Sequence, residues 1–200
     1  MDSSAPVLSE EELWLAFQQG EERAFAFLFH TYYNDLYNYA LKISRDEALA
    51  KDVIQELFAS IWRTRQQLGA IKTVKPYLMK SLRRALLRAL SRKKNLLLKA
   101  RQSPGPDITF SPEEVVINEE SASTRRLFVL RQLNDLSSRQ REVIYLRYYD
   151  DLSYDEIAQV MGLNYQSVMN HLHKALKALR SNQTLKHLVE VALALCLSLQ

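Results

Sequence analysis

The scarcity of glycine and proline constrains the fold of this chain more than any other feature of its sequence. Only four glycines and five prolines occur among 200 residues. Sheets built from many short strands need turn residues about every ten positions. The residues between the few breakers instead repeat apolar side chains at three- and four-residue spacing, which is typical of helices. An all-α fold with short connections is therefore expected.

Local signals place four helices in the first half of the chain. Ser9 and Glu12 have the spacing of a capping box, and Gly20 is suited to end the helix that they begin. Periodicity predicts further helices over the ranges 22–43, 46–67 and 75–94.

The composition changes at 102–112, where three prolines and one glycine exclude a regular element. Helical periodicity then resumes over 113–134, 138–149, 153–161, 165–180 and 184–199. The expected organisation is two helical domains joined by a flexible linker and followed by an apolar helix, with boundaries at 1–98, 99–122, 123–182 and 183–200.

Positive charge is concentrated in one segment. Residues 63–101 carry thirteen lysines and arginines, and no acidic residue lies between Glu56 and Asp107. The other residues hold 14 positive charges against 23 negative ones, a net of −9. An ordinary solvated face would mix acids with the bases. This asymmetry favours a nucleic-acid partner, with an anionic membrane surface as the alternative.

Several classes of protein are excluded. The single cysteine, Cys196, excludes a disulfide scaffold. No histidine has other potential metal ligands at a suitable spacing, so neither a metal nor a cofactor is expected. The chain has no phosphate-binding glycine loop or nucleophile motif, which predicts no enzyme activity and no small-molecule substrate. Its start lacks a signal peptide, and the apolar run at 188–199 is too short to cross a bilayer. A cytoplasmic protein without stable membrane insertion is expected.

The residues 152–168 have the pattern of a helix-turn-helix. Ser153 and Glu156 form a second capping-box spacing, and Gly162 fits the left-handed turn that separates two short helices. The second helix of such a motif lies in the DNA major groove. Its outward side chains are expected to contact DNA: Tyr165, Gln166, Ser167, Asn170, His171 and Lys174.

Two stretches resemble a known family. LSSRQREV at 136–143 with LSYDEIAQVMG at 152–162 is similar to region four of bacterial sigma factors of the extracytoplasmic-function type. DVIQELF at 52–58, followed by Ile61 and Trp62, resembles sigma region two. The resemblance covers about 11–180 and has both motifs in the order of the family.

The resemblance implies a dissociable subunit that binds RNA polymerase core and promoter DNA and directs initiation, with an anti-sigma factor as an expected partner. By spacing alone, Asp52 and Glu56 favour an ordinary solvated face. The resemblance instead implies a core-polymerase contact made by Asp52, Gln55, Glu56 and Trp62.

The resemblance also implies that region two melts the −10 element. Melted DNA needs cations for its backbone and an aromatic surface or a pocket for its unstacked bases. The residues that fit these needs are Lys72, Lys75, Tyr77, Lys80, Arg83, Arg84 and Arg88. Tyr77 stands where the family usually has tryptophan and Arg84 where many members have asparagine. Region four would hold the −35 element through the helix-turn-helix.

Other interpretations stay open at this stage. A helix-turn-helix regulator that binds DNA without polymerase is the main alternative, although its usual sensor domain is absent here. A helical protein of the membrane surface is a more distant one. The apolar residues of 184–199 are expected either to pack on a domain or to bind a partner or a membrane.

Overall fold

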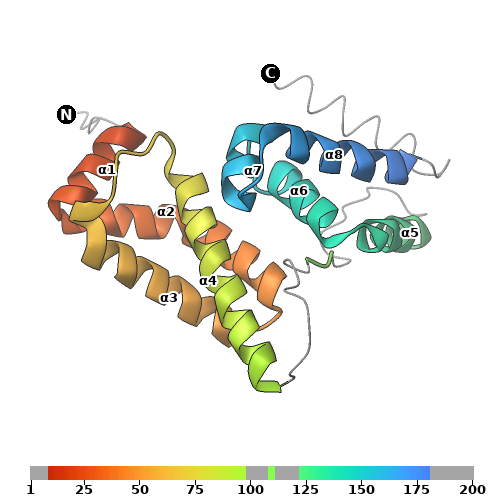
Figure 1. The fold of residues 1–200 in the computed structure, drawn as a ribbon, viewed down its shortest axis with the longest axis horizontal. Coiled ribbons are helices and arrows are strands. Elements are labelled where there is room, and N and C mark those ends of the chain that lie inside the picture. The colour runs from red at the N-terminus through yellow and green to blue at the C-terminus, as the bar shows by residue number, and fades with distance from the viewer. Residues whose placement is uncertain (1–8, 98–107, 111–121, 181–200) are drawn as a thin grey trace. The chain divides into compact units, whose positions relative to one another are not determined.

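The computed structural model describes residues 9–97, 108–110 and 122–180, and every regular element in those ranges is a helix. Contacts divide the chain into two compact units, the first mainly α1 to α4 and the second mainly α5 to α8 (Figure 1). The expected all-α fold of two helical domains is confirmed. The helix expected at 184–199, and residues 113–121 of another, lie outside the described residues.

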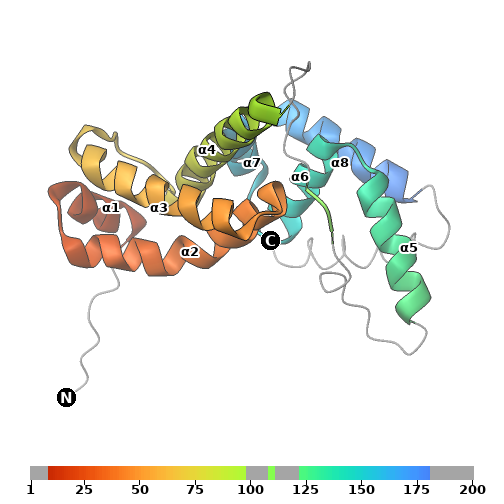
Figure 2. The same cartoon turned by 90° about the horizontal axis from the view of Figure 1, so that it is seen from below.

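The first unit consists of four α-helices and a short 3-10 helix. These are α1 (Glu10–Gln19), α2 (Glu22–Ser44), α3 (Glu47–Thr64), the 3-10 helix η1 (Arg65–Gln67) and α4 (Val74–Leu97). The helices α2, α3 and α4 all contact one another, and α1 packs on α2 (Figures 1 and 2). The third helix was expected to run to residue 67, but its last turn is the tighter 3-10 form.

The limits of α1 follow from the two local signals in its sequence. The Ser9 hydroxyl accepts from the Glu12 N–H at 3.2 Å, and the Glu12 carboxylate accepts from the Ser9 N–H at 2.8 Å. At the other end Gly20 has a φ of 91°, a left-handed conformation that few other residues adopt. Both expected ends of this helix are confirmed.

Three side chains of α1 hold the connection between η1 and α4. Glu10 accepts from the Tyr32 hydroxyl at 2.8 Å and from the Val74 N–H, at the start of α4, at 3.0 Å. The Trp14 indole donates to the Gly69 carbonyl at 3.1 Å, and the Gln18 side-chain amide donates to the Leu68 carbonyl. The basic helix α4 therefore begins at a point fixed by long-range hydrogen bonds.

The second unit contains α5 (Ala122–Asp135), α6 (Ser138–Tyr148), α7 (Tyr154–Met161) and α8 (Tyr165–Arg180). The helices α6 and α8 pack on each other. The Arg141 guanidinium donates to the carbonyls of Asn134 and Leu136 at 2.6 Å each, which satisfies groups left open where α5 ends.

The helix-turn-helix formed by α7 and α8 has the predicted local geometry. The Glu156 carboxylate accepts from the Ser153 N–H at 2.8 Å, and Gly162 has a φ of 66°. Val168 on α8 is fully buried. A cap not predicted from the sequence is Asn164, whose side chain accepts from the Ser167 N–H at 2.7 Å at the start of α8.

Candidate nucleic-acid interface

One side of α4 carries a continuous row of cations. Lys80, Arg84, Arg88 and Arg92 follow one another at four-residue spacing, and all but the half-buried Lys80 are exposed. Residues four apart lie on one face of a helix about 6 Å from each other. We call these four residues the α4 stripe. It offers a polyanion one positive charge per turn with no acid between them.

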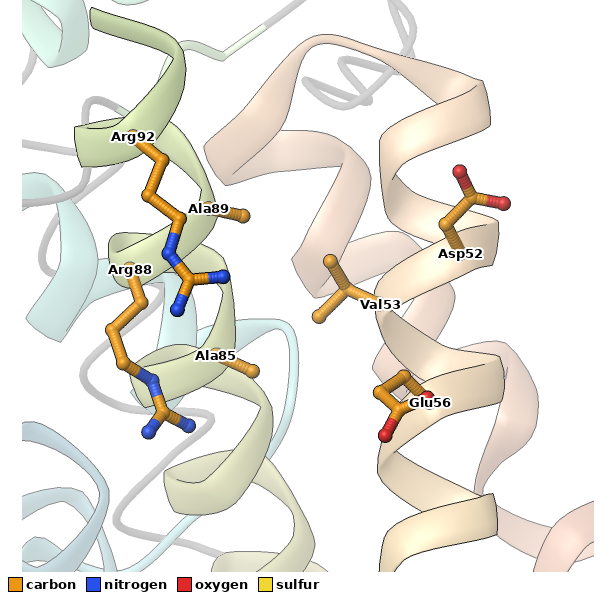
Figure 3. A pocket seen from close by; sticks show the side chains of 7 residues that line it. All are labelled: Asp52, Val53, Glu56, Ala85, Arg88, Ala89 and Arg92. Carbon is orange, nitrogen blue, oxygen red and sulfur yellow. The ribbon is translucent and has the colours of Figure 1, made fainter. Parts of the chain in front are cut away.

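A groove lies beside this stripe, between α3 and α4, with a volume of about 380 Å³ (Figure 3). In the figure, the carboxylates of Asp52 and Glu56 stand on the α3 side and the guanidinium groups of Arg88 and Arg92 on the α4 side. Small apolar side chains lie between the two rims, from Val53, Ala85 and Ala89. The groove thus has one acidic rim and one basic rim.

Three of the four residues expected to bind core polymerase lie on this acidic rim or next to it along α3. Asp52, Gln55 and Glu56 are exposed, as a contact surface requires. Glu56 is not free, because the Arg63 guanidinium lies 2.7 Å from its carboxylate. Both side chains are well exposed, so water and salt weaken this pair. Among the described residues none is paired with Asp52.

The fourth residue of this set, Trp62, lies partly in the core and partly at the surface. The ring is half-buried and lies 4.9 Å from the Phe25 ring. The Arg65 guanidinium carbon stands 4.4 Å from the centre of the Trp62 ring and covers part of it.

Two of the residues expected to bind melted DNA are engaged within the first unit. The Lys75 ammonium lies 2.8 Å from the Asp35 carboxylate of α2. Tyr77 is half-buried, with its ring edge-on to Trp14 at 5.3 Å. Burial raises the pKa of Tyr77, and a hydrogen bond with Ser81 offsets part of that rise. These contacts could not be derived from the sequence, because each partner comes from another element or depends on how α4 is rotated.

The other residues expected to bind melted DNA differ in how exposed their side chains are. Lys72 is exposed in the connection before α4, and Arg84 and Arg88 are exposed on the α4 stripe. Arg83 is half-buried and lies off the stripe by about a quarter of a turn. Arg92 is not among the predicted DNA contacts but belongs to the stripe, and its position four residues after Arg88 identifies it.

The exposed side of α8 carries most of the residues expected to contact duplex DNA. Tyr165, Gln166, Asn170 and Lys174 are exposed, whereas Ser167 and His171 are half-buried. The Gln166 amide donates to the Asn170 side-chain oxygen at 3.2 Å.

Further exposed residues extend this side of α8. His173 and Lys177 are three and seven residues beyond Asn170, which places them on the same side of the helix. Neither residue is among the predicted DNA contacts, although this spacing identifies both.

The surroundings of His171 disfavour protonation of its imidazole. Partial burial lowers the pKa of His171, and the positive charges of Arg139 and Lys174 lower it further. The imidazole is therefore neutral at pH 7, where it is able to donate or accept a hydrogen bond but adds no charge to the surface.

Among the described residues, no three histidine, cysteine or acidic side chains gather as they would around a metal ion. None of the helices in the described ranges is both long and apolar enough to span a membrane.

Comparison with known proteins matches each half of the chain to a family model. Residues 28–96 match Sigma-70 region 2, and residues 124–179 match Sigma-70, region 4. The ECF RNA polymerase sigma factor SigL of Mycobacterium tuberculosis is 32% identical over 152 residues, which cover 72% of this chain and 80% of SigL. This chain belongs to the ECF RNA polymerase sigma factor family. It is a sigma factor, which binds RNA polymerase and directs it to promoters.

A second ECF RNA polymerase sigma factor and two solved structures show a more distant likeness. SigK of Mycobacterium ulcerans is 27% identical over 165 residues, covering 82% of this chain and 87% of SigK. The fold resembles CnrH, solved with the cytosolic domain of CnrY, at a TM-score of 0.57 and 21% identity over 90% of this chain and 96% of CnrH. It also resembles RpoE, solved with the anti-sigma factor NepR from Bartonella quintana, at a TM-score of 0.58 and 17% identity. The match covers 82% of this chain and 98% of RpoE.

The sigma-region matches coincide with the surfaces described above. The region 2 match contains the groove and the α4 stripe, and the region 4 match contains the helix-turn-helix. The helix α1, which anchors the start of α4 through Glu10, precedes the region 2 match.

Proposed function

We propose that this sigma factor divides initiation among three surfaces. The exposed residues Asp52, Gln55 and Glu56 of α3, with Trp62, bind core polymerase. The α4 stripe and Lys72 hold the melted −10 strand, and the exposed side of α8 reads the −35 duplex. The protein acts in the cytoplasm as a dissociable subunit and catalyses no reaction itself.

The α4 stripe is the observation that carries this proposal. Four cations at intervals of about 6 Å, without an acid among them, match an extended strand of phosphates better than a single compact anion. The helix that carries the stripe begins at the connection that Trp14 and Glu10 hold in place. A strand bound along α4 therefore meets a rigid surface.

The helix α8 supports the second DNA contact. Amide side chains such as those of Gln166 and Asn170 are suited to adenine edges in the major groove, and an exposed lysine such as Lys174 is suited to phosphates. The Asn164 cap fixes the start of this helix, which is the end that enters the groove in helix-turn-helix proteins.

We also propose that an anti-sigma partner regulates the protein, as the complexes of CnrH and RpoE suggest. The groove between α3 and α4 suits a segment with cations along one side and acids along the other, which would face Asp52 and Glu56 on one rim and Arg88 and Arg92 on the other. Such a segment would cover part of the core-binding surface and part of the α4 stripe together.

Run-off transcription with purified core polymerase on a promoter library tests the function. We expect promoter-specific transcripts only when the protein is added. The double variant Arg84→Ala, Arg88→Ala should bind core but fail to open promoters, measured by permanganate reactivity of the melted strand. Arg23→Ala, an exposed arginine at the start of α2, is the control for lost charge. If the protein binds specific DNA equally well with and without core polymerase, and no transcripts appear, the result would favour a stand-alone regulator.

A further inference from the structure

A row of side chains along α1 binds one stretch of backbone in the first unit. Glu10, Trp14 and Gln18 follow one another at four-residue spacing, which places them on the same side of the helix. All three hydrogen-bond to the connection at 68–74, which lies 50 to 64 residues further along the chain. The bonds run from the Gln18 amide to the Leu68 carbonyl, from the Trp14 indole to the Gly69 carbonyl at 3.1 Å, and from the Val74 N–H to the Glu10 carboxylate at 3.0 Å. We call Glu10, Trp14 and Gln18 the α1 row.

The connection that the α1 row binds lies outside the helices and is open to solvent over much of its length. Residues 68–73 separate η1 from α4, and Gly69, Ala70 and Lys72 are exposed. Holding such a segment in one conformation costs backbone entropy. Because the α1 row bonds to the backbone at both ends of the connection, that cost is offset when the protein folds rather than when it binds DNA.

The α1 row is itself held in place by the core of the first unit. Only 2% of the Trp14 surface is exposed, and its ring contacts Phe17 at 5.0 Å and Tyr77, in the first turn of α4, at 5.3 Å. The Glu10 carboxylate also accepts from the Tyr32 hydroxyl at 2.8 Å. Its negative charge lies at the N-terminus of α4, where the first N–H groups have no acceptor within their own helix. The α1 row therefore fixes both the connection and the start of α4.

We infer that the α1 row is a positioning element for promoter opening, which holds the connection in the conformation that receives the melted strand. The inference rests on the proposed function, in which Lys72 of this connection and the α4 stripe bind that strand. A connection that is already ordered adds no ordering cost when the strand binds, so the affinity for the strand is higher. The proposed core contacts all lie on α3, so a looser connection should leave the affinity for core polymerase unchanged.

Two single substitutions loosen the connection without removing a charge. Trp14→Phe keeps an aromatic ring in the core but cannot donate to the Gly69 carbonyl, and Gln18→Ala removes the donor to the Leu68 carbonyl. The probe is a single-stranded oligonucleotide with the −10 element of a promoter selected in the run-off experiment, bound by the protein together with core polymerase. Each variant should bind this oligonucleotide about fivefold more weakly, the usual effect of one hydrogen bond, and open the duplex promoter correspondingly less. Gln19→Ala, an exposed amide at the next position of α1, is the matched control and should bind as the wild type does.

A third variant separates positioning from stability. Tyr32→Phe removes the other partner of Glu10 and lowers the stability of the first unit, but it leaves all three bonds to the connection in place. At a temperature where every variant is folded, Tyr32→Phe should keep the native affinity for the oligonucleotide. Amide hydrogen exchange at 69–74 should be faster in Trp14→Phe and Gln18→Ala than in either the wild type or Tyr32→Phe.

Three results are decisive. Native affinity for the oligonucleotide in Trp14→Phe and Gln18→Ala would overturn the inference, whether or not hydrogen exchange is faster. Equal losses of affinity for core polymerase and for the oligonucleotide would also overturn it, because they would show that α1 only supports the fold. A wild-type protein that selects no promoter in the run-off experiment would instead refute the proposed function itself.

Discussion

The side-chain amide of Gln166 donates a hydrogen bond to the side-chain oxygen of Asn170, one turn further along α8. Asn170 thus uses one of the two lone pairs of its side-chain oxygen and keeps both N–H donors, while Gln166 keeps its acceptor and one N–H. A base edge would meet these two residues as one unit that combines a donor from Asn170 with an acceptor from Gln166. We therefore expect Gln166 and Asn170 to read one base pair together rather than two base pairs independently.

Base discrimination by these two residues should be non-additive. Asn170→Ala and Gln166→Ala should each lose about 1–3 kcal/mol of discrimination at the same base pair. The double variant should lose little more than the larger single loss, because either substitution already breaks the unit. Transcription of a promoter library by each variant measures these values. Gln159→Ala, an exposed amide on α7, should leave the preferences intact, and losses at two different positions would contradict the shared reading.

Lys174 should contribute affinity without sequence preference. The exposed ammonium lies beyond the two amides and is suited to a phosphate. Lys174→Ala should weaken binding to all promoters alike and reduce the slope of log K against log salt by about one. Binding titrations at several salt concentrations check this, with Lys51→Ala on α3 as the control for a lost charge. A shift in base preference would show that α8 is oriented differently on DNA.

Asp52 should matter more for core binding than Glu56. Arg63 already pairs with Glu56, so the Glu56 carboxylate must be shared with a partner, whereas Asp52 has no such partner among the described residues. Asp52→Ala should reduce affinity for core polymerase several-fold, and Glu56→Ala should reduce it less. Helicity should not change, because exposed acids contribute little to folding. Glu47→Ala, an exposed acid on the same helix, is the control in a pull-down, and equal losses for all three variants would contradict a specific contact.

The free energy of unfolding should fall at high pH because the Tyr32 phenol ionises. Burial raises the pKa of Tyr32, and the hydrogen bond to Glu10 raises it further. The phenol is therefore protonated in the folded state at a pH where it ionises in the unfolded chain. Its contribution is complete below the ordinary pKa of about 10 and is lost as the pH rises above that value, by up to about 1.4 kcal/mol per pH unit.

Urea unfolding between pH 9 and pH 11 measures this effect. The free energy of unfolding should fall less steeply in Tyr32→Phe than in the wild type. At pH 7 the substitution should cost about 1–3 kcal/mol, since the Glu10 carboxylate loses a buried partner. Tyr33→Phe, at the next position of α2, controls for the loss of a phenol. An unchanged pH dependence in Tyr32→Phe would contradict the role of this contact.

The sequence predicted those parts of the structure that depend on neighbouring residues. Ser9 with Glu12, Ser153 with Glu156, and the two left-handed glycines act within one turn of their own helix. The exposed amides of α8 follow from helical spacing alone. Such signals need no knowledge of the rest of the chain, and they located the helix-turn-helix.

The contacts that the sequence did not predict join residues far apart in the chain. Asp35 pairs with Lys75 across two helices, and Asn134 binds a backbone 24 residues earlier. From charge alone Lys75 is predicted to be one more cation for DNA, because a lysine with an acidic partner and one without look alike in a sequence. The packing of Tyr77 on Trp14 likewise depends on how α1 and α4 meet.

The Arg65 guanidinium lies so close to Gly20 that it leaves little room for a side chain at position 20. A Cβ atom on Gly20 would lie 3.2 Å from the Arg65 Nε, and the φ of 91° is unfavourable for other residues. The guanidinium has little freedom to move away, because it covers the Trp62 ring and donates to the Trp62 carbonyl at 2.8 Å. Gly20→Ala should therefore destabilise the first unit by about 1–2 kcal/mol.

A loss of about 1–2 kcal/mol of stability should make Gly20→Ala a temperature-sensitive variant. In a domain of 60–100 residues, each kcal/mol lowers the melting temperature by about 4–8 °C. Because Gly20 lies outside the surfaces proposed to contact polymerase or DNA, the altered protein would keep its promoter preferences while folded. A strain carrying Gly20→Ala should express the target genes of this sigma factor at a low growth temperature and silence them several degrees higher, which would let heat alone switch the regulon off.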